Sequence, residues 1–242
     1  AELATQGRSH SGTPSALPQE QQKPYVIDIK DMNATGQAKV VVAKVANVLA
    51  TAPDDLNWLS PSERERVTGL RVLTRRQHYL AGHWLLRTQL ALQFANAASD
   101  WQLIERDGLP PAIEGSDLQL SLSHSGAWIA AAWSSTAIGI DLEQRGRRPA
   151  LGRFADLLLA CDDEPGSVDD DGLLQRWVVK EALIKCQHGS ALPQQLAALR
   201  LRRTSVGGAV ELLSTADFHL AVVSQQNFQH QLDLPILQRQ LW

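Results

Sequence analysis

The sequence predicts an α+β fold, because segments with strand periodicity and segments with helix periodicity follow one another without the regular alternation of a parallel α/β chain. Leu118, Leu120 and Leu122 alternate with polar residues, which is typical of a half-buried strand. Apolar residues within 74–96 instead recur near helical spacing. With 44% hydrophobic and 20% charged residues, the chain of 242 residues has the composition of a folded globular protein.

The N-terminal part is predicted to contain a tail, a strand and a helix start. Residues 1–24 are rich in Gln, Ser, Pro and Gly and carry no apolar pattern, so we expect a disordered tail. The valine run that follows predicts a strand within residues 25–49. A helix is expected to begin with Ser60 as N-cap, Pro61 at its first position and Glu63 completing a capping box.

A long helix and a hairpin are predicted in the middle of the chain. The helix covers about 74–96, and the Asp-Gly and Pro-Pro pairs within 107–111 are expected to break the chain after it. Two strands, 118–123 and 128–133, then form a hairpin that turns at Ser125-Gly126.

The C-terminal part is predicted to mix strands and helices. A strand runs over 137–143, and helices over 151–160 and 173–187 are separated by an acidic loop around residues 169–171. Three further strands are expected near 197–202, 210–213 and 218–223.

Charge and cysteine usage exclude several classes of protein. The formal net charge of −3 gives no general attraction to phosphate polymers, so we expect no nucleic-acid partner. No stretch reaches about 18 consecutive apolar residues, so we expect no membrane partner and a cytoplasmic location. Cys161 and Cys186 are expected to be free thiols, because two cysteines are too few to staple a secreted fold.

Two acidic residues on the strand 137–143 form the first candidate site. In the segment Gly139-Ile140-Asp141-Leu142-Glu143, Asp141 and Glu143 point to the same face of the strand, about 7 Å apart. Carboxylate oxygens suit a hard cation such as Mg²⁺, which also takes phosphate oxygens from a substrate. A plain solvated strand face is the alternative.

The helix 173–187 carries the second candidate site. Glu181 lies at helical spacing from Leu174, Trp177 and Val178, which places a carboxylate in an apolar stripe. A metal ion would offset the cost of burying this charge, and Lys185, one turn away, could hold a phosphate. The alternative is a surface ion pair between Glu181 and Lys185, which contributes a few tenths of a kcal/mol.

The hairpin tip is the third candidate site. The segment Ser121-Leu122-Ser123-His124-Ser125-Gly126 gathers hydroxyls, an imidazole and turn amides, which favours a phosphate or adenine site. A structural role for His124 is the alternative. No G-x-S-x-G elbow accompanies these serines, which argues against a serine hydrolase.

The three segments, in this order, resemble the 4'-phosphopantetheinyl transferases of the larger, surfactin-synthetase-activating (Sfp) type. That family carries a serine-histidine motif on a strand, then G-I-D-x-E, then W-x-x-K-E-x-x-x-K. The likeness covers about residues 58–193. It implies a pseudo-twofold pair of similar α+β halves, 25–136 and 137–242, with coenzyme A and the metal between them, and a monomer.

The resemblance implies a Mg²⁺-dependent transferase of the holo-[acyl-carrier-protein] synthase type. Such an enzyme moves the 4'-phosphopantetheine arm of coenzyme A onto a serine of an apo acyl or peptidyl carrier protein and releases adenosine 3',5'-bisphosphate. In this family pattern Asp141, Glu143 and Glu181 bind the metal, and Glu181 and Lys185 are the catalytic pair. The residues implied to contact coenzyme A are Arg66, Arg106, Ser123, His124, Glu181 and Lys185.

One departure from the family pattern concerns the cofactor site. Leu109 stands where relatives commonly carry lysine, so Arg106 is expected to supply the basic contact. Two other functions remain open: a noncatalytic coenzyme A-binding module and a Mg²⁺-dependent pyrophosphohydrolase.

Basic residues suggest two further surfaces. Arg76, His83 and Arg87 share one side of the helix 74–96 and form either a phosphate-facing surface or a polar solvent face. Carrier proteins of this kind are usually acidic, so a basic cluster after the metal motif is expected to steer one in. The cluster consists of Arg145, Arg147, Arg148 and Arg153.

Overall fold

The computed structural model describes residues 25–29, 38–146, 151–159, 168–187, 195–196, 199–204, 210–224 and 231–235. The expected tail at 1–24, Arg147, Arg148 and Cys161 lie outside the described residues.

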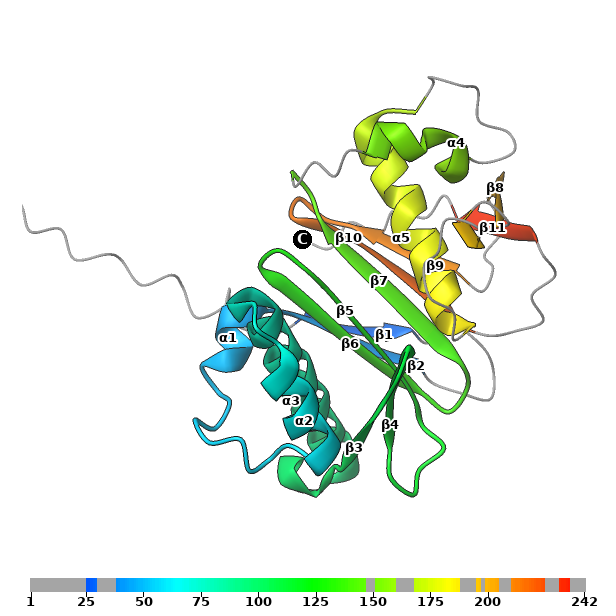
Figure 1. Ribbon diagram of the computed structural model, residues 1–242. Helices are drawn as coiled ribbons and strands as arrows, with labels where there is room; N and C mark the ends of the chain where they lie inside the picture. Colours follow the sequence, from blue (N-terminus) through cyan, green and yellow to red (C-terminus); the bar gives the residue numbers. More distant parts are fainter. Residues whose placement is uncertain are drawn as a thin grey trace, which may run out of the picture.

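The first half of the chain builds an antiparallel sheet with the strand order β1-β2-β6-β5 (Figure 1). These strands are β1 (Tyr25–Ile29), β2 (Ala38–Lys44), β5 (Gln119–Ser125) and β6 (Trp128–Ser134). The long helix α3 (Leu73–Phe94) packs on one face of this sheet through an apolar side.

The second half builds a three-stranded antiparallel sheet with the order β7-β10-β9. Its strands are β7 (Ile138–Gln144), β9 (Val210–Ser214) and β10 (Phe218–Ser224). The helix α5 (Asp170–Cys186) covers one face of this sheet (Figure 1).

A shared core joins the two sheets. Val40 and Ala130 of the first sheet lie in one buried cluster with Ile140, Leu142 and Phe218 of the second. The layers therefore run α3, first sheet, second sheet, α5. Because strand side chains alternate between faces, Asp141 and Glu143 point away from this core and toward α5.

The remaining elements are shorter. They are α1 (Val45–Leu49), α2 (Pro61–Gly69), η2 (Ala98–Asp100), β3 (Leu103–Arg106), β4 (Leu109–Ile113), η3 (Leu151–Phe154), α4 (Ala155–Leu158), β8 (Arg200–Thr204) and β11 (Gln231–Pro235). None of the helices among the described residues is long and apolar enough to cross a bilayer.

The α+β class, the capping box of α2 and the hairpin β5-β6 are confirmed. The strand expected within 25–49 is partly wrong, because residues 45–49 form the helix α1. Val45 and Val48 pack into the cluster beneath α3, so tertiary packing outweighs their strand propensity.

Two predicted chain breaks are ordered elements. The acidic residues 169–171 begin α5: the side chain of Asp169 accepts a hydrogen bond from the Gly172 amide at 2.8 Å, and the next two acids lie in the first helical turn. The Asp-Gly pair of 107–111 turns a hairpin between β3 and β4, with Gly108 at φ 69°. The Pro-Pro pair lies where the register of this hairpin shifts, at a bulge that tolerates proline.

Candidate functional site

The geometry of the acidic site depends on Gly139. A Cβ atom at this position would lie 2.0 Å from the Ala182 carbonyl oxygen and 2.3 Å from the Cys186 amide nitrogen. The backbone of α5 therefore lies directly against β7, an approach that only glycine permits. This contact brings the helix residues Glu181 and Lys185 next to the strand residues that follow Gly139.

Asp141 is the most enclosed carboxylate of the site, with 5% of its surface exposed. Its Oδ1 atom lies 2.7 Å from Lys185 Nζ and 2.9 Å from Ser123 Oγ. Its Oδ2 atom is buried and has no hydrogen-bond partner among the described residues. A buried carboxylate oxygen without a partner is costly unless a cation or a bound group meets it.

Three serines of β5 connect the edges of the two sheets. The hydroxyl oxygens of Ser121 and Ser123 accept hydrogen bonds from the amides of Ile140 and Leu142, both at 3.0 Å. Ser123 also donates to Asp141, and Ser125 donates to Glu143 at 2.5 Å. Between β5 and β7, hydrogen bonds to serine side chains thus take the place of backbone–backbone hydrogen bonds, and they orient both strand carboxylates.

Glu181 completes the acidic group from the side of α5. Burial raises its pKa, the negative charge of Asp141 raises it further, and Lys185 opposes both effects; with the added charge of Glu143 the pKa reaches about 7. The two strand carboxylates therefore act on Glu181 at short range, in a region with more negative than positive charge. A carboxylate with a pKa near neutrality is suited to accept a proton.

These residues fit a hard divalent cation in an open site. The unpartnered Asp141 oxygen and the mutual repulsion of three carboxylates are both relieved by positive charge. The described residues contain no group of three or more His, Cys, Asp or Glu side chains that would hold a metal by themselves. Mg²⁺ commonly uses one or two carboxylates and completes its shell with substrate phosphate and water.

His124 lies between Ser123 and Ser125 on β5, and its side chain is exposed. Its ring stacks on the ring of His78 with the centroids 4.4 Å apart and an angle of 22° between the planes. His78 comes from α3, and its Nε2 atom lies 2.8 Å from the Gly126 carbonyl oxygen at the hairpin turn. Sequence reasoning missed His78, because only the packing of α3 brings it to the hairpin.

The other residues expected to contact the cofactor lie in different settings. Ser123 is buried, and its hydroxyl is engaged by Asp141 and by the Leu142 amide. Arg66 is exposed on α2. Arg106 is exposed on the β3-β4 hairpin, where its guanidinium donates to the Pro110 carbonyl oxygen at 2.7 and 2.9 Å. Their contacts to coenzyme A stay predictions.

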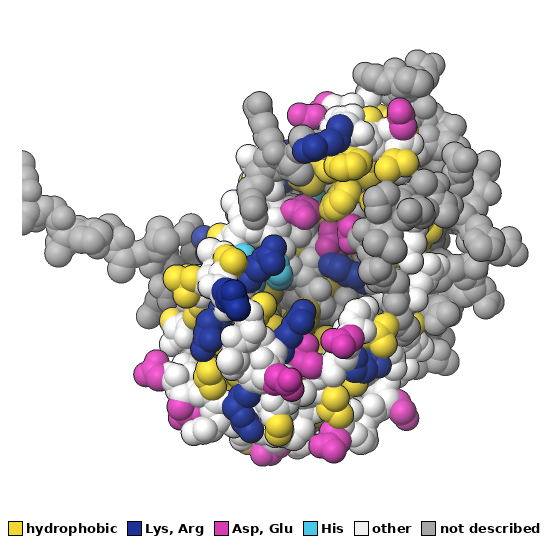
Figure 2. Space-filling model, viewed as in Figure 1, with side chains coloured by type: hydrophobic (Ala, Val, Ile, Leu, Met, Phe, Trp, Pro, Cys, Tyr) yellow, Lys and Arg dark blue, Asp and Glu magenta, His cyan; other side chains and the backbone are white. Residues whose placement is uncertain are grey.

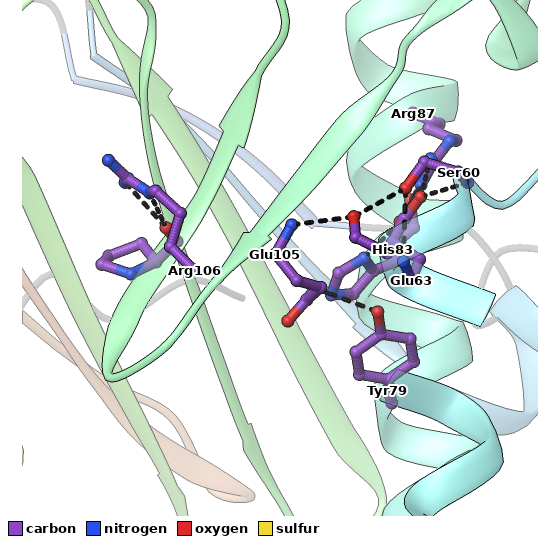
Figure 3. A network of polar contacts seen from close by, with 9 residues as sticks. Ser60, Glu63, Tyr79, His83, Arg87, Glu105 and Arg106 are labelled. Carbon is purple, nitrogen blue, oxygen red and sulfur yellow. Dashed lines mark hydrogen bonds and ion pairs between the residues drawn. The ribbon is translucent and has the colours of Figure 1, made fainter. Parts of the chain in front are cut away.

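Both interpretations of the basic side of α3, a phosphate-facing surface or a polar solvent face, are wrong for His83 and Arg87. His83 and Arg87 are buried and bind Glu63 of α2 (Figure 3). Arg87 reaches both Glu63 oxygens, at 2.5 and 2.7 Å, and His83 Nδ1 lies 2.6 Å from Oε1. The apolar setting forces these charges to pair inside the protein.

The charge balance around Glu63 is opposite to that around Glu181. Burial by itself raises the pKa of Glu63, but the hydrogen bonds and charges of His83 and Arg87 outweigh burial and lower it to about 2. The backbone amide of Ser60 also donates to Glu63, at 2.7 Å. Figure 3 shows Tyr79 and Glu105 beside this network, with the tyrosine hydroxyl donating to Glu105 at 2.9 Å.

The basic cluster expected after β7 is only partly described. Arg145 is engaged within the protein, because it pairs with Asp171. The guanidinium of Arg153 lies over the Phe154 ring, 5.6 Å from its centroid. On the face shown in Figure 2, acidic, basic and histidine side chains gather around a hollow between the two halves of the molecule.

Comparison with known proteins yields two curated relatives. No family model matches the chain. It is 27% identical over 158 residues to the 4'-phosphopantetheinyl transferase Sfp of Bacillus subtilis (strain 168), which covers 61% of this chain and 69% of the relative. It is 26% identical over 157 residues to the 4'-phosphopantetheinyl transferase ffp of Bacillus subtilis, which covers 61% of this chain and 67% of the relative. Together with the three ordered motifs, these matches support the resemblance of the chain to the Sfp-type 4'-phosphopantetheinyl transferases.

Proposed function

We propose that the protein transfers the 4'-phosphopantetheine arm of coenzyme A to a serine hydroxyl of an apo acyl or peptidyl carrier protein, with Mg²⁺, and releases adenosine 3',5'-bisphosphate. The observation that carries this proposal is the unpartnered, buried Oδ2 atom of Asp141 beside Glu181 and Lys185. Carboxylates next to a lysine suit a reaction in which a pyrophosphate and a metal ion arrive together.

Asp141, Glu143 and Glu181 are the residues that would hold Mg²⁺. The ion, when bound, supplies positive charge to the pyrophosphate oxygens on which negative charge develops. Ser123 and Ser125 keep the two strand carboxylates oriented through their hydroxyls. The positive charge of the ion would then offset the excess negative charge that these carboxylates bring together.

Glu181 is the proposed general base. Its pKa of about 7 allows it to take the proton of the carrier serine near neutral pH. The serine oxygen then attacks the phosphorus that carries the pantetheine arm, a new phosphorus–oxygen bond forms, and the bond to the bridging pyrophosphate oxygen breaks. The leaving adenosine 3',5'-bisphosphate takes that bridging oxygen with its electron pair.

Lys185 is proposed to contact the phosphate being transferred. Its ammonium lies 2.7 Å from Asp141 Oδ1, so it stands at the edge of the carboxylate group. His124, held by the stacked ring of His78, would contact the nucleotide end of coenzyme A, together with Arg66 and Arg106. Ser123, which directly precedes His124 on β5, would help to place the hairpin against the nucleotide end of coenzyme A.

We also propose that the two halves, 25–136 and 137–242, are related by a pseudo-twofold axis and act as a monomer. Each half has an antiparallel sheet with one long helix, α3 or α5, on its outer face, which supports such a duplication (Figure 1). Coenzyme A would then bind between the halves, near the seam of β5 and β7.

The test is to incubate the protein with coenzyme A, Mg²⁺ and a panel of apo carrier proteins, and to weigh each carrier by intact mass spectrometry. We expect one carrier or more to gain a phosphopantetheine group. Glu181→Gln should abolish the gain, whereas Glu114→Gln, at an exposed position of the β4-β5 connection, should preserve it.

Two results would contradict the proposal. Release of adenosine 3',5'-bisphosphate without any modified carrier would indicate a pyrophosphohydrolase. Binding of coenzyme A by the protein with neither product formed would indicate a noncatalytic binding module.

A further inference from the structure

An ion pair joins the end of β7 to the start of α5. Arg145 directly follows β7, and its guanidinium contacts both carboxylate oxygens of Asp171, at 2.9 and 3.1 Å. The third guanidinium nitrogen donates to the Thr215 carbonyl oxygen at 2.8 Å, and the Arg145 amide donates to the Asp217 carbonyl oxygen at 2.8 Å. A two-point contact of this kind fixes orientation as well as distance.

A buried histidine holds the same carboxylate from β10. His219 is fully buried, and its Nε2 atom lies 3.0 Å from Asp171 Oδ1. Its Nδ1 atom lies 2.8 Å from Ser214 Oγ of β9. Because a carboxylate accepts hydrogen bonds, Nε2 carries the proton and Nδ1 accepts from the serine hydroxyl. The ring is closed to substrates, which excludes a hydrolase triad of Ser214, His219 and Asp171.

These contacts act on the two elements that carry the acidic site. Glu181 follows Asp171 by ten residues on α5, a distance of about 15 Å along the helix. Arg145 follows Glu143 by two residues on the chain. The contact at Gly139 fixes α5 near its C-terminal end, and the Arg145–Asp171–His219 clamp fixes its N-terminal end. Two separated contacts define the direction of a helix, whereas one lets it pivot.

We propose that the Arg145–Asp171–His219 clamp positions α5 so that Glu181 stays next to Asp141 and Glu143, and that it thereby sets the affinity of the protein for the divalent ion. The three clamp residues touch neither substrate nor metal, so they are positioning residues. This inference rests on the proposed function.

The test compares two substitutions that remove one negative charge from the first turn of α5. Asp171→Asn breaks the clamp, because the amide is uncharged and has one acceptor oxygen, whereas the carboxylate accepts from Arg145 and His219 through two charged oxygens. Asp170→Asn is the matched control, because Asp170 is exposed in the same turn and the loss of its charge alters the helix dipole in the same way. Both variants are first checked for folding by circular dichroism.

Metal binding is measured with Mn²⁺ by electron paramagnetic resonance in the presence of coenzyme A, and transfer is followed over a range of Mg²⁺ concentrations. We expect Asp171→Asn to weaken Mn²⁺ binding about tenfold and to raise the Mg²⁺ concentration for half-maximal rate by a similar factor. Losses of this size are typical when a residue that orients a metal ligand is substituted. Asp170→Asn should change both by less than twofold, and Arg145→Lys should be intermediate because it keeps the charge and loses the fork.

A folded Asp171→Asn protein that binds Mn²⁺ as the unsubstituted protein does would overturn the inference, even if its melting temperature is lower. Failure of the unsubstituted protein to modify any carrier would instead contradict the proposed function. Normal Mn²⁺ binding by the unsubstituted protein, weakened in Asp171→Asn alone, would support the clamp in either case.

Discussion

The two halves of the molecule both bury glutamate side chains next to charged neighbours, but they balance the charge in opposite ways. Around Glu63, burial raises the pKa, but the hydrogen bonds and charge contributed by His83 and Arg87 outweigh burial, and the pKa of Glu63 falls to about 2. Around Glu181, burial and the acids Asp141 and Glu143 outweigh Lys185, and the pKa of Glu181 rises to about 7. The first network pairs its charges within the protein, whereas the second leaves Asp141 Oδ2 without a hydrogen-bond partner among the described residues, where we propose that a cation binds.

The difference shows what each network contributes. A fully paired buried network ties α2 to α3 and contributes to the stability and uniqueness of the N-terminal half. A network with surplus carboxylates lowers stability and is retained where binding or catalysis uses it. Substitutions in the two networks should therefore affect stability with opposite signs.

The largest effect is expected from Arg87→Leu. The substitution leaves Glu63 buried without its guanidinium partner, so the free energy of unfolding should fall by about 3–5 kcal/mol. Urea denaturation followed by circular dichroism measures this change. Arg75→Leu, at an exposed position of the same helix, should alter stability far less. Equal losses in the two variants would show that the Glu63 pair contributes nothing special.

Lowering the pH should remove the stability that ionised Glu63 contributes. The folded-state pKa of Glu63, about 2, lies below its ordinary value of 4.5. The unfolded chain therefore binds the proton first, and the stability from this pair is fully present above about pH 4.5 and is lost as the pH falls toward 2. The loss amounts to about 3 kcal/mol. The unfolding free energy of Glu63→Gln, measured over the same range, should vary less with pH than that of the unsubstituted protein.

Glu181→Gln should stabilise the metal-free protein. The folded-state pKa of Glu181, about 7, lies above its ordinary value of 4.5, so ionised Glu181 costs stability that grows as the pH rises from 4.5 through 7. At pH 8, in a chelating buffer, the variant should unfold with a free energy higher by about 2 kcal/mol. At pH 5 the difference should shrink. A variant that is less stable at pH 8 would refute the idea of surplus negative charge.

The smallest effect is expected from Ser125→Ala. Loss of the hydroxyl that donates to Glu143 should lower the unfolding free energy by about 1 kcal/mol or less. It should nevertheless raise the Mg²⁺ concentration needed for half-maximal transfer, because Glu143 is then less well oriented. Ser99→Ala, at an exposed site, serves as the control. An unchanged Mg²⁺ requirement would show that the Ser125 hydroxyl does not contribute to metal binding.

Local patterns in the sequence were sufficient to predict much of the fold and the shared strand face of Asp141 and Glu143. The alternation around Asp141 puts Ile140 and Leu142 on the opposite face of the strand, and both are buried in the core that joins the two sheets. The capping box of Ser60 and Glu63 and the hairpin at Gly126 are also local, and the structure contains both. Such features depend on residues within one turn or one strand, so the sequence shows them directly.

Partners distant in the sequence could not be predicted in the same way. The spacing of Lys185 suggested a pair with Glu181, but Lys185 pairs with Asp141, 44 residues earlier. The spacing of Arg87 suggested a surface, but Arg87 is buried against Glu63, 24 residues earlier. Helical periodicity says which residues share a side of a helix and leaves open what that side packs against.

The sequence by itself determined the identity of the acidic residues, the elements that carry them and the order of the three motifs, because these follow from periodicity and short-range chemistry. Only the tertiary structure decided which charges meet. Gly139 allows the backbone of α5 to lie against β7, the clamp at Asp171 joins the other ends, and Glu63 is enclosed between α2 and α3. Whether a buried carboxylate is paired or left for a ligand depends on these long-range contacts, since burial and neighbouring charge together set its free energy.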